Sequence, residues 1–219
     1  MSNLSRLLMT QKGFFITFEG GDGSSKTTQA KLLRHYLQNA GFKILLTREP
    51  GGTALGERLR DIILQENTAN ITDLLLVMAA RNEHLDKVIK PAMKDGVVVI
   101  CDRFIDSTAT YQATSDLSID SIYQLHAMLF DNLMPDLTIL LNLDPEEALR
   151  RAQKRNETLE DKMETKGLNF HLDVFEKYHQ ISRLFPDRVK VVDANRDIQE
   201  IKEEIDNIIK TIPYFKDRL

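Results

Sequence analysis

The amino-acid sequence predicts a doubly wound α/β fold, with a five-stranded parallel sheet and helices on both faces. Five short runs rich in branched apolar residues recur along the chain, at 14–18, 44–46, 97–100, 137–143 and 189–192. Such continuous hydrophobicity is typical of strands buried on both faces of a parallel sheet. Longer stretches with helical spacing separate these runs, and this alternation favours parallel strands joined by right-handed crossovers.

The helices are predicted from apolar residues that recur every three or four positions. In the first of them Leu33 and Leu37 share one face, and Gly41 provides a stop signal. The predicted ranges are 26–39, 74–93, 118–129 and 198–209. Because 219 residues allow one large domain and no linker or internal repeat interrupts them, we expect a single domain over 1–219.

The charge balance and the cysteine content exclude two classes of protein. The chain has 29 Lys and Arg against 33 Asp and Glu, a formal net charge of −4. A polybasic nucleic-acid binder needs excess positive charge, so we expect no nucleic-acid partner. Cys101 is the one cysteine, which excludes an internal disulfide and a multi-cysteine zinc site. We expect a reducing, cytoplasmic compartment.

Two segments differ from the predicted sheet and helices. Residues 1–12 have no small-residue cleavage site, so we expect a flexible tail rather than a signal peptide. No apolar run reaches the roughly 18 residues of a membrane span. The segment 150–167 is dense in charge, with RRAQKRNETLEDKMETK over 150–166. Two interpretations stay open for it, a solvated helical face or a small charged lid over a charged ligand.

A glycine-rich segment follows the first predicted strand and leads directly into a helix. It reads GGDGSSKTT over residues 20–28 and resembles a P-loop, whose pattern is G-x-x-x-x-G-K-[ST]. Backbone N–H groups of such a loop cradle phosphates, and the helix N-terminus adds partial positive charge. The motif therefore predicts a P-loop NTPase fold that binds ATP with Gly20, Gly21, Asp22, Gly23, Ser24, Ser25, Lys26, Thr27 and Thr28.

The residue types in this loop predict separate roles. Lys26 would neutralise the terminal phosphates, and the Thr27 hydroxyl would bind Mg²⁺. Ser25 stands where the pattern has glycine. Its Cβ lies where the backbone approaches phosphate, so weaker nucleotide binding is the expected consequence.

Polar residues also follow two other predicted strands. Arg48 comes at the end of the second strand, beside Gly51 and Gly52, and its guanidinium could bind a phosphate in bidentate fashion. The third strand ends in Asp102 and Arg103. A carboxylate at this place is typical of the Mg²⁺ ligand of P-loop enzymes, which acts through water, and Arg103 would face the phosphates. Cys101 is interpreted as a small buried apolar residue.

These clusters together resemble the thymidylate (dTMP) kinase family, in its bacterial form. The matching stretches are FEGGDGSSKTTQAKLL (18–33), TREPGGT (47–53), AARNEHLDKVIKPAM (79–93) and DRFIDSTATYQ (102–112). Adenylate, guanylate and cytidylate kinases do not carry the second and fourth together. The resemblance runs from Phe14 to about Ile209. It implies an enzyme that transfers the γ-phosphate of ATP to dTMP with Mg²⁺, and that usually forms homodimers.

The resemblance also implies roles for residues of the acceptor site. Arg48 and Arg103 would bind the phosphate of dTMP, and Arg81 would donate to a thymine carbonyl. Asp22 would meet the sugar 3′-hydroxyl. Further contacts to the base and deoxyribose are implied for Thr108, Tyr111 and Gln112.

The catalytic residues implied by the resemblance are Lys26, Asp102, Arg103 and two lid arginines, Arg151 and Arg155. Two positions depart from the family pattern. Val77 stands where a phenylalanine stacks on the base, so weaker thymine binding is expected, because base–aromatic stacking contributes roughly 1–3 kcal/mol. Lys162 replaces a lid arginine after Asp161.

Two alternatives to a thymidylate kinase were considered from the sequence. A regulatory GTPase shares the P-loop, but it needs an Asn-Lys-x-Asp sequence that reads guanine, and the chain has none. A catalytically weak or differently selective nucleotide-binding protein is the second alternative, suggested by Ser25 and Val77. An assay of ADP formation separates it from an active kinase.

Overall fold

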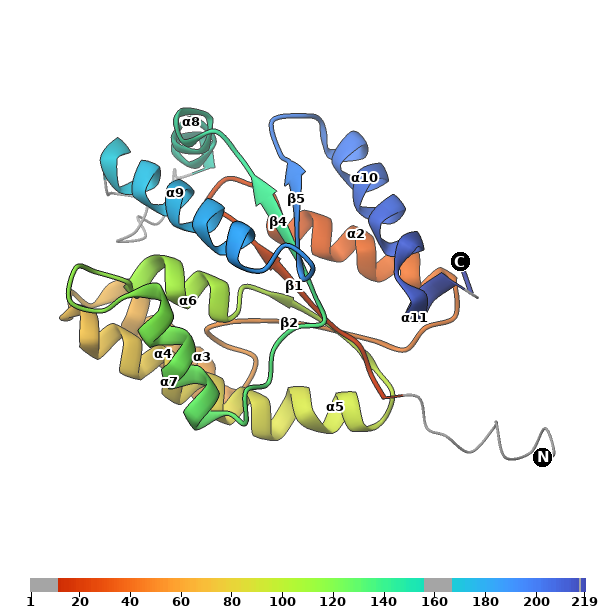
Figure 1. Ribbon diagram of the computed structural model, residues 1–219, viewed down its shortest axis with the longest axis horizontal. Coiled ribbons are helices and arrows are strands. Elements are labelled where there is room, and N and C mark those ends of the chain that lie inside the picture. The colour runs from red at the N-terminus through yellow and green to blue at the C-terminus, as the bar shows by residue number, and fades with distance from the viewer. Residues whose placement is uncertain (1–11, 156–166, 217) are drawn as a thin grey trace.

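The structure is a computed structural model that describes residues 12–155, 167–216 and 218–219, without the side chains of 152–155. A five-stranded parallel sheet forms its centre, in the order β2-β3-β1-β4-β5 (Figure 1). The strands are β1 (Phe15–Glu19), β2 (Ile44–Arg48), β3 (Val98–Asp102), β4 (Leu137–Asn142) and β5 (Val189–Asp193). All four pairings are parallel. The predicted five-stranded α/β sheet is therefore confirmed.

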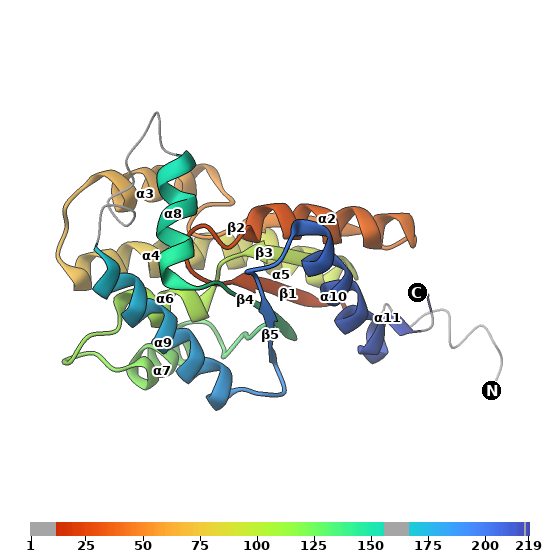
Figure 2. The same cartoon turned by 90° about the horizontal axis from the view of Figure 1, so that it is seen from above.

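Helices cover both faces of the sheet, as Figures 1 and 2 show. One core lies under α2 (Lys26–Asn39), α10 (Ile198–Thr211) and α11 (Pro213–Lys216), with Ala148 of α8 (Pro145–Arg155) at its end. The opposite core lies under α4 (Asn70–His84), α6 (Ile105–Gln112), α7 (Ile119–Leu129) and α9 (Leu168–Leu184). The helix α3 (Ala54–Gln65) packs on α4.

Strand residues alternate between the two cores. In β1, Phe15 belongs to the core under α4 and α9, whereas Ile16 and Phe18 belong to the core under α2 and α10. The chain thus buries both faces of β1, which explains why its sequence is mostly apolar. The register sets Phe18 and Arg48 beside Asp102, so the P-loop and the ends of β2 and β3 meet at one edge.

The predicted helix 74–93 is interrupted in the structure. It is made of α4, a π-helical turn η1 (Leu85–Ile89) and α5 (Lys90–Lys94). Pro91 has no N–H to donate to the preceding turn, so a regular α-helical ladder cannot run through this position. The remaining predicted helices agree closely with α2, α7 and α10.

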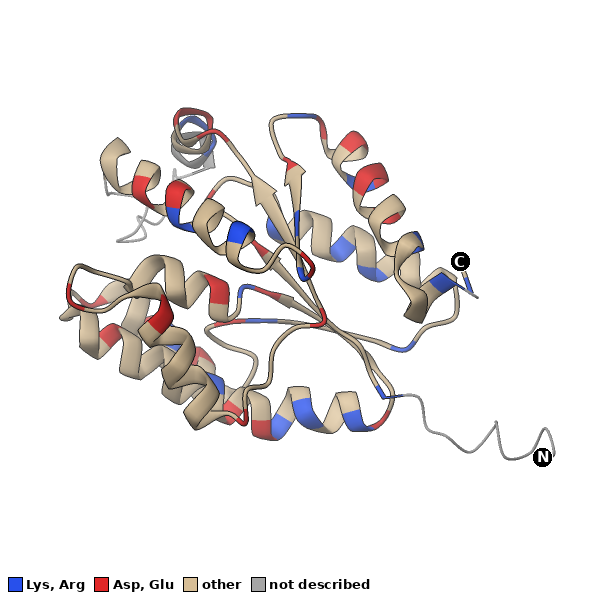
Figure 3. Ribbon diagram, viewed as in Figure 1, with Lys and Arg blue, Asp and Glu red and all other residues tan. Residues whose placement is uncertain are grey.

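Parts of two predictions fall outside the described residues. The predicted tail 1–12 is described only at Lys12, and the lid 150–167 only through the end of α8 and Gly167. Within the described ranges, no helix is long and apolar enough to cross a membrane. Acidic residues gather on α10, and Figure 3 shows basic residues on α2 and α5.

Candidate functional site

The P-loop joins the end of β1 to the start of α2. Gly20 has a φ of 138°, and a Cβ on it would lie 2.5 Å from the carbonyl oxygen of Leu141, so only glycine fits there. The Nζ of Lys26 lies inside the loop and donates to the carbonyl oxygen of Gly21 at 2.8 Å. Burial, together with the charge of Arg103, lowers the pKa of Lys26 to about 8. The loop thus holds a buried cation ready for an anion.

Ser25 adopts the conformation that the P-loop pattern reserves for glycine. It is the N-cap residue of α2, with φ 67° and ψ 22°, and its side chain makes no capping hydrogen bond. The left-handed region costs a residue with a Cβ roughly 1–2 kcal/mol. The loop therefore keeps its backbone shape despite the serine, at a cost in stability.

Replacing Ser25 with glycine is expected to stabilise the protein by about 1 kcal/mol, because glycine adopts this φ without strain. Urea unfolding of both proteins measures the difference. Ser24→Gly, at a buried neighbouring position without a positive φ, is the control and should not stabilise. Equal or lower stability of the Ser25→Gly protein would contradict a strained serine.

Thr27 and Asp102 bring two oxygen donors together at the sheet edge. The Thr27 hydroxyl donates to Oδ2 of Asp102 at 2.5 Å, although 75 residues separate the two. Thr27 is exposed and Asp102 is half-buried. Hard oxygen ligands suit Mg²⁺, which keeps several waters and takes one or two protein oxygens together with substrate phosphates. The two oxygens of Thr27 and Asp102 therefore fit the predicted Mg²⁺ site.

Arg103 lies between the P-loop and α6, in a strained backbone conformation with φ 71°. Its guanidinium binds Asp22 and donates to the carbonyl oxygen of Gly20 at 3.1 Å and to Ser107 Oγ at 3.2 Å. It also lies over the ring of Tyr111. Burial raises the pKa of Asp22, but the charges of Arg103 and Lys26 outweigh it and hold that pKa below its usual value. Strained residues persist where the surroundings over-determine them, as at binding sites.

Arg81 is almost completely buried and extends from α4 toward the same region. Its Nε donates to Glu49 Oε2 at 2.7 Å, and its Nη2 donates to Thr108 Oγ1 at 2.8 Å. Its guanidinium carbon lies 4.6 Å from the centre of the Phe104 ring. Burial raises the pKa of Glu49, but Arg81 and His84 together lower it below its usual value. Arg81 is thus held on three sides.

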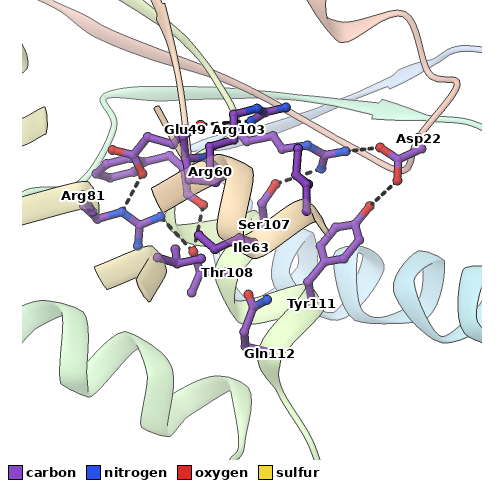
Figure 4. Close-up of a pocket in the computed structure, with 14 residues that line it drawn as sticks. Asp22, Glu49, Arg60, Ile63, Arg81, Arg103, Ser107, Thr108, Tyr111 and Gln112 are labelled. Carbon is purple, nitrogen blue, oxygen red and sulfur yellow. Dashed lines mark hydrogen bonds and ion pairs between the residues drawn. The ribbon is translucent and has the colours of Figure 1, made fainter. Parts of the chain in front are cut away.

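A cavity of about 120 Å³ lies between these two arginines. Figure 4 shows Arg81 at one end, Arg103 and Tyr111 beside Asp22 at the other, and Gln112 between the two ends. Its apolar wall is built by Ile63, Leu64, Val77 and Phe104. The structure therefore brings together Asp22, Val77, Arg81, Arg103, Thr108, Tyr111 and Gln112, all predicted from the sequence. An apolar slot with a cation at each end suits a planar ring that bears an anionic group.

A larger cavity adjoins the first and contains most of the P-loop. It is lined by Lys26, Thr27, Thr28, Asp102 and Arg151, among others. Arg151 donates to Glu147 and to the carbonyl oxygen of Ala194. The side chain of Arg155, also predicted to be catalytic, lies outside the described residues. Asp22, Glu49, Arg60 and Arg103 line both cavities, so the two share part of their walls.

Arg48 lies away from the smaller cavity. Its guanidinium is half-exposed at the wall of the larger cavity and pairs with Glu57 at 2.6 Å. Arg60, which the sequence reasoning missed, lines both cavities and donates to the carbonyl oxygen of Pro50 at 3.0 Å. Arg60 lies on α3, a helix that was not predicted. The amphipathic stretch could have indicated the helix, but it gave no signal for Arg60 itself.

Glu19 is a further residue that sequence reasoning missed. It ends β1, is fully buried, and accepts hydrogen bonds from the Phe104 N–H and from Ser107 Oγ. The Tyr178 hydroxyl of α9 lies 2.9 Å from Ser107 Oγ. Burial raises the pKa of Glu19 to about 7, and the charge of Asp106 contributes to the increase. Glu19 and Tyr178 thus support Ser107, which contacts Arg103.

Because the pKa of Glu19 is raised, this group makes the free energy of unfolding decrease as pH rises. The unfolded chain ionises this group near pH 4.5 and the folded chain near 7, so its stabilising contribution is complete below 4.5 and is lost as pH rises through 7. A shift of this size corresponds to ~3 kcal/mol. Glu19→Gln should therefore become more stable relative to wild type as pH rises from about 5 to about 8. Urea unfolding at both pH values measures this, and a constant difference would contradict it.

Cys101 is fully buried, and its thiol donates to the carbonyl oxygen of Arg103 at 3.1 Å. Burial raises the pKa of this thiol well above its ordinary value. The thiolate is therefore not accessible at neutral pH, and the interpretation of Cys101 as a buried apolar residue is confirmed.

The chain is similar to known proteins along most of its length. A family model described as thymidylate kinase matches residues 18–205. A thymidylate kinase of Orientia tsutsugamushi is 43% identical over 204 residues, which are 91% of this chain and 94% of that protein. One of Rickettsia typhi is 42% identical over 185 residues, 84% of this chain and 90% of that protein.

Similarity to a solved structure agrees with these matches. The crystal structure of thymidylate kinase from Ehrlichia chaffeensis superposes with a TM-score of 0.73 at 33% identity, covering 90% of this chain and 98% of that one. The family model spans more than half of the chain, and the relatives cover most of it at over 40% identity. The chain therefore belongs to the thymidylate kinase family.

Proposed function

We propose that the protein transfers the γ-phosphoryl group of ATP to dTMP, which gives ADP and dTDP. The observation that carries this is the pair of adjoining cavities at the carboxyl edge of the sheet, one built on the P-loop and one built around Arg81. Two arginines, Arg60 and Arg103, line both. This arrangement suits a donor and an acceptor whose phosphates meet between the cavities.

The smaller cavity binds the acceptor in this proposal. Arg81 donates to a thymine carbonyl, and Val77 with the other apolar residues of the wall covers the ring. Gln112 and Thr108 lie at the base edge, Tyr111 packs on the deoxyribose, and Asp22 meets the 3′-hydroxyl. Arg103 binds the 5′-phosphate, and Arg60 adds a second cation. Arg48 also binds the 5′-phosphate, once its ion pair with Glu57 breaks.

The larger cavity binds ATP. Gly20, Gly21, Asp22, Gly23, Ser24 and Ser25 surround the phosphates, with Thr28 at the start of α2. Lys26 neutralises their charge from inside the loop. Thr27 would hold Mg²⁺ directly and Asp102 would hold it through water. The metal ion would supply positive charge that neutralises the phosphates.

The transfer needs positioning more than it needs a base. A phosphate monoester has its second pKa near about 6, so an oxygen of the dTMP phosphate is already anionic at neutral pH. That oxygen bonds to the γ-phosphorus while the bond to the β–γ bridging oxygen breaks and ADP leaves. Repulsion between the two phosphate chains is the main obstacle, and Lys26, Arg103, Arg151 and Arg155 offset it.

Removing the carboxylate at Asp102 is expected to raise the Mg²⁺ concentration that supports half-maximal activity by about 10-fold, since a charged ligand becomes neutral in Asp102→Asn. Titration of activity against Mg²⁺ at saturating nucleotide measures it. Asp95→Asn, in the turn before β3 and outside both cavities, is the matched control. An unchanged Mg²⁺ requirement in the Asp102→Asn protein would remove Asp102 from the metal site.

The proposed reaction is tested by ADP release measured with ATP, Mg²⁺ and each of dTMP, dUMP and dGMP. We expect ADP to form with dTMP far above the blank without acceptor, and least with dGMP, whose purine is larger than the slot. ADP formation no higher than the blank would favour the alternative of a catalytically weak nucleotide-binding protein. A preference for dGMP would contradict the assignment of the smaller cavity.

We propose further that the protein is a cytoplasmic homodimer. Ile71 and Leu75 are exposed on α4, whereas Leu74 and Met78 of the same helix are buried in the core. An exposed apolar stripe of this kind suits a second copy of the chain. Sedimentation velocity tests the proposal, and a monomer at all accessible concentrations would contradict it.

A further inference from the structure

We propose that His84 is a positioning residue for base selection, acting through Glu49 on Arg81. The inference rests on the proposed function in one respect, the contact of Arg81 with the thymine carbonyl. His84 lies three residues after Arg81, so both side chains extend from the same face of α4. Both are almost completely buried, and so is Glu49 between them.

The contacts form a continuous chain from the end of β2 to the cavity. His84 Nε2 lies 2.7 Å from Thr47 Oγ1, and His84 Nδ1 lies 3.0 Å from Glu49 Oε1. The other oxygen of Glu49 accepts from Arg81 Nε at 2.7 Å. The two oxygens of one carboxylate therefore hold the histidine and the arginine at once, and rotation of the carboxylate would change both contacts.

The direction of each hydrogen bond follows from the donors available. An ionised carboxylate only accepts, so Nδ1 of His84 carries a proton. In the neutral imidazole Nε2 is then an acceptor, and the Thr47 hydroxyl donates to it. The lowered pKa of Glu49 agrees with an ionised carboxylate. Glu49 thus selects the tautomer of His84 with the proton on Nδ1, and the Thr47 hydroxyl contacts the other ring nitrogen.

The loop after β2 closes around the histidine ring. A Cβ on Gly52, which has a φ of 76°, would lie 2.4 Å from Nε2 of His84 and 2.8 Å from Oγ1 of Thr47. Glycine at this position lets the backbone approach the ring. The ring therefore cannot rotate without displacing the loop, and its orientation is set from both sides.

These contacts leave one nitrogen of the Arg81 guanidinium, Nη1, without a strong acceptor among the described residues. Nε binds Glu49 and Nη2 binds Thr108, whereas Nη1 meets, among the described residues, the weak acceptor Met78 Sδ at 4.0 Å. The Nη1 hydrogens are therefore available to a ligand in the cavity. A donor at this place can donate to the C4 carbonyl of thymine. It disfavours cytosine, which has an amino group at C4 and no acceptor there.

The test is the ratio of kcat/KM for dTMP to that for dCMP, measured in two histidine variants. In His84→Asn the amide nitrogen replaces Nδ1 and can still donate to Glu49, whereas His84→Gln places its amide near Nε2 and loses that contact. We expect His84→Gln to lower the dTMP/dCMP ratio about 10-fold with KM for ATP within about twofold of wild type, since a hydrogen bond to a charged group is lost. His84→Asn should keep most of the ratio.

Thr47→Val and Tyr123→Phe complete the test. Thr47→Val replaces the hydroxyl with a methyl group and leaves the Glu49 contact of His84 in place, so it should give a smaller decrease in the ratio than His84→Gln. Tyr123→Phe removes a hydrogen bond from α7 to Asp106 of α6, outside the smaller cavity, and should lower the thermal midpoint without changing the ratio. The Tyr123→Phe variant thus shows the effect of a loss of stability that does not involve Arg81.

The outcomes separate this inference from the proposed role of Arg81. If Arg81→Met lowers the dTMP/dCMP ratio but His84→Gln does not, the inference is wrong and the role of Arg81 stands. If Arg81→Met leaves the ratio unchanged, Arg81 does not read the base and both fail. Equal losses with dTMP, dCMP and ATP in His84→Gln, or better retention by Gln than by Asn, would also overturn the inference.

Discussion

Replacing Arg103 with alanine is expected to lower kcat/KM for dTMP by at least about 10³-fold, the lower end of what an arginine contributes at a transferring phosphoryl group. Arg103 lines both cavities and lies within hydrogen-bond reach of the P-loop carbonyl of Gly20. Its loss removes the cation between two phosphate chains and leaves Asp22 to repel them. Steady-state kinetics with dTMP varied at saturating ATP measures the effect.

The size of this effect depends on geometry as well as charge. Arg103→Lys keeps a cation but not the planar fork that binds Asp22 while facing phosphate, so we expect a decrease of about 10²-fold, between alanine and wild type. Arg183→Ala, at an exposed position on α9 outside both cavities, is the matched control and should retain activity. Near wild-type turnover in Arg103→Ala would remove Arg103 from the catalytic residues.

Replacing Glu49 with alanine is expected to lower the free energy of unfolding by about 3–5 kcal/mol, because the buried guanidinium of Arg81 would lose its counter-ion. Both side chains are at most 2% exposed, with Nε and Oε2 2.7 Å apart. Glu83→Ala is the matched control on α4, since Glu83 pairs with exposed Lys87 and such surface pairs contribute about 0–1 kcal/mol. Urea unfolding of the three proteins measures both effects.

A second substitution separates loss of the pair from loss of packing. When Arg81→Met is combined with Glu49→Ala, no charge remains unpaired, so much of the lost stability should return. The double variant should nevertheless bind dTMP weakly, because the base-reading donor is absent. If the single Glu49→Ala variant is as stable as wild type, the buried ion pair of Glu49 and Arg81 does not stabilise the fold.

Much of the fold could be predicted because local patterns set it. The run Phe14–Phe18 is apolar except for Thr17, since β1 is covered on both faces. Helix 26–39 was predicted with its observed bounds because the P-loop determines where it starts. The interruption at Leu85–Ile89 was not predicted, since apolar spacing continues through it. The helix α9 was not predicted either; it begins directly after the charged segment 150–167.

The site could be predicted where strand ends and motifs place residues, and not where packing decides. Asp102 and Arg103 follow an apolar strand, and the structure places both at the sheet edge beside the P-loop. The partners of Arg81 are different: Glu49 lies 32 residues away and His84 belongs to a stretch that looks like an ordinary helix. Arg60 faces the cavities only because α3 packs on α4, which no local pattern indicates.

The crystal structure of the protein with dTMP bound tests whether the smaller cavity is the acceptor site. We expect the thymine ring in the slot lined by Val77, with a ring carbonyl within hydrogen-bond distance of Arg81 Nη1 and the 5′-phosphate on Arg103, toward the P-loop. The opposite orientation, with the phosphate on Arg81, would contradict the account. So would dTMP bound in the P-loop cavity, because the smaller cavity would then have no role as the acceptor site.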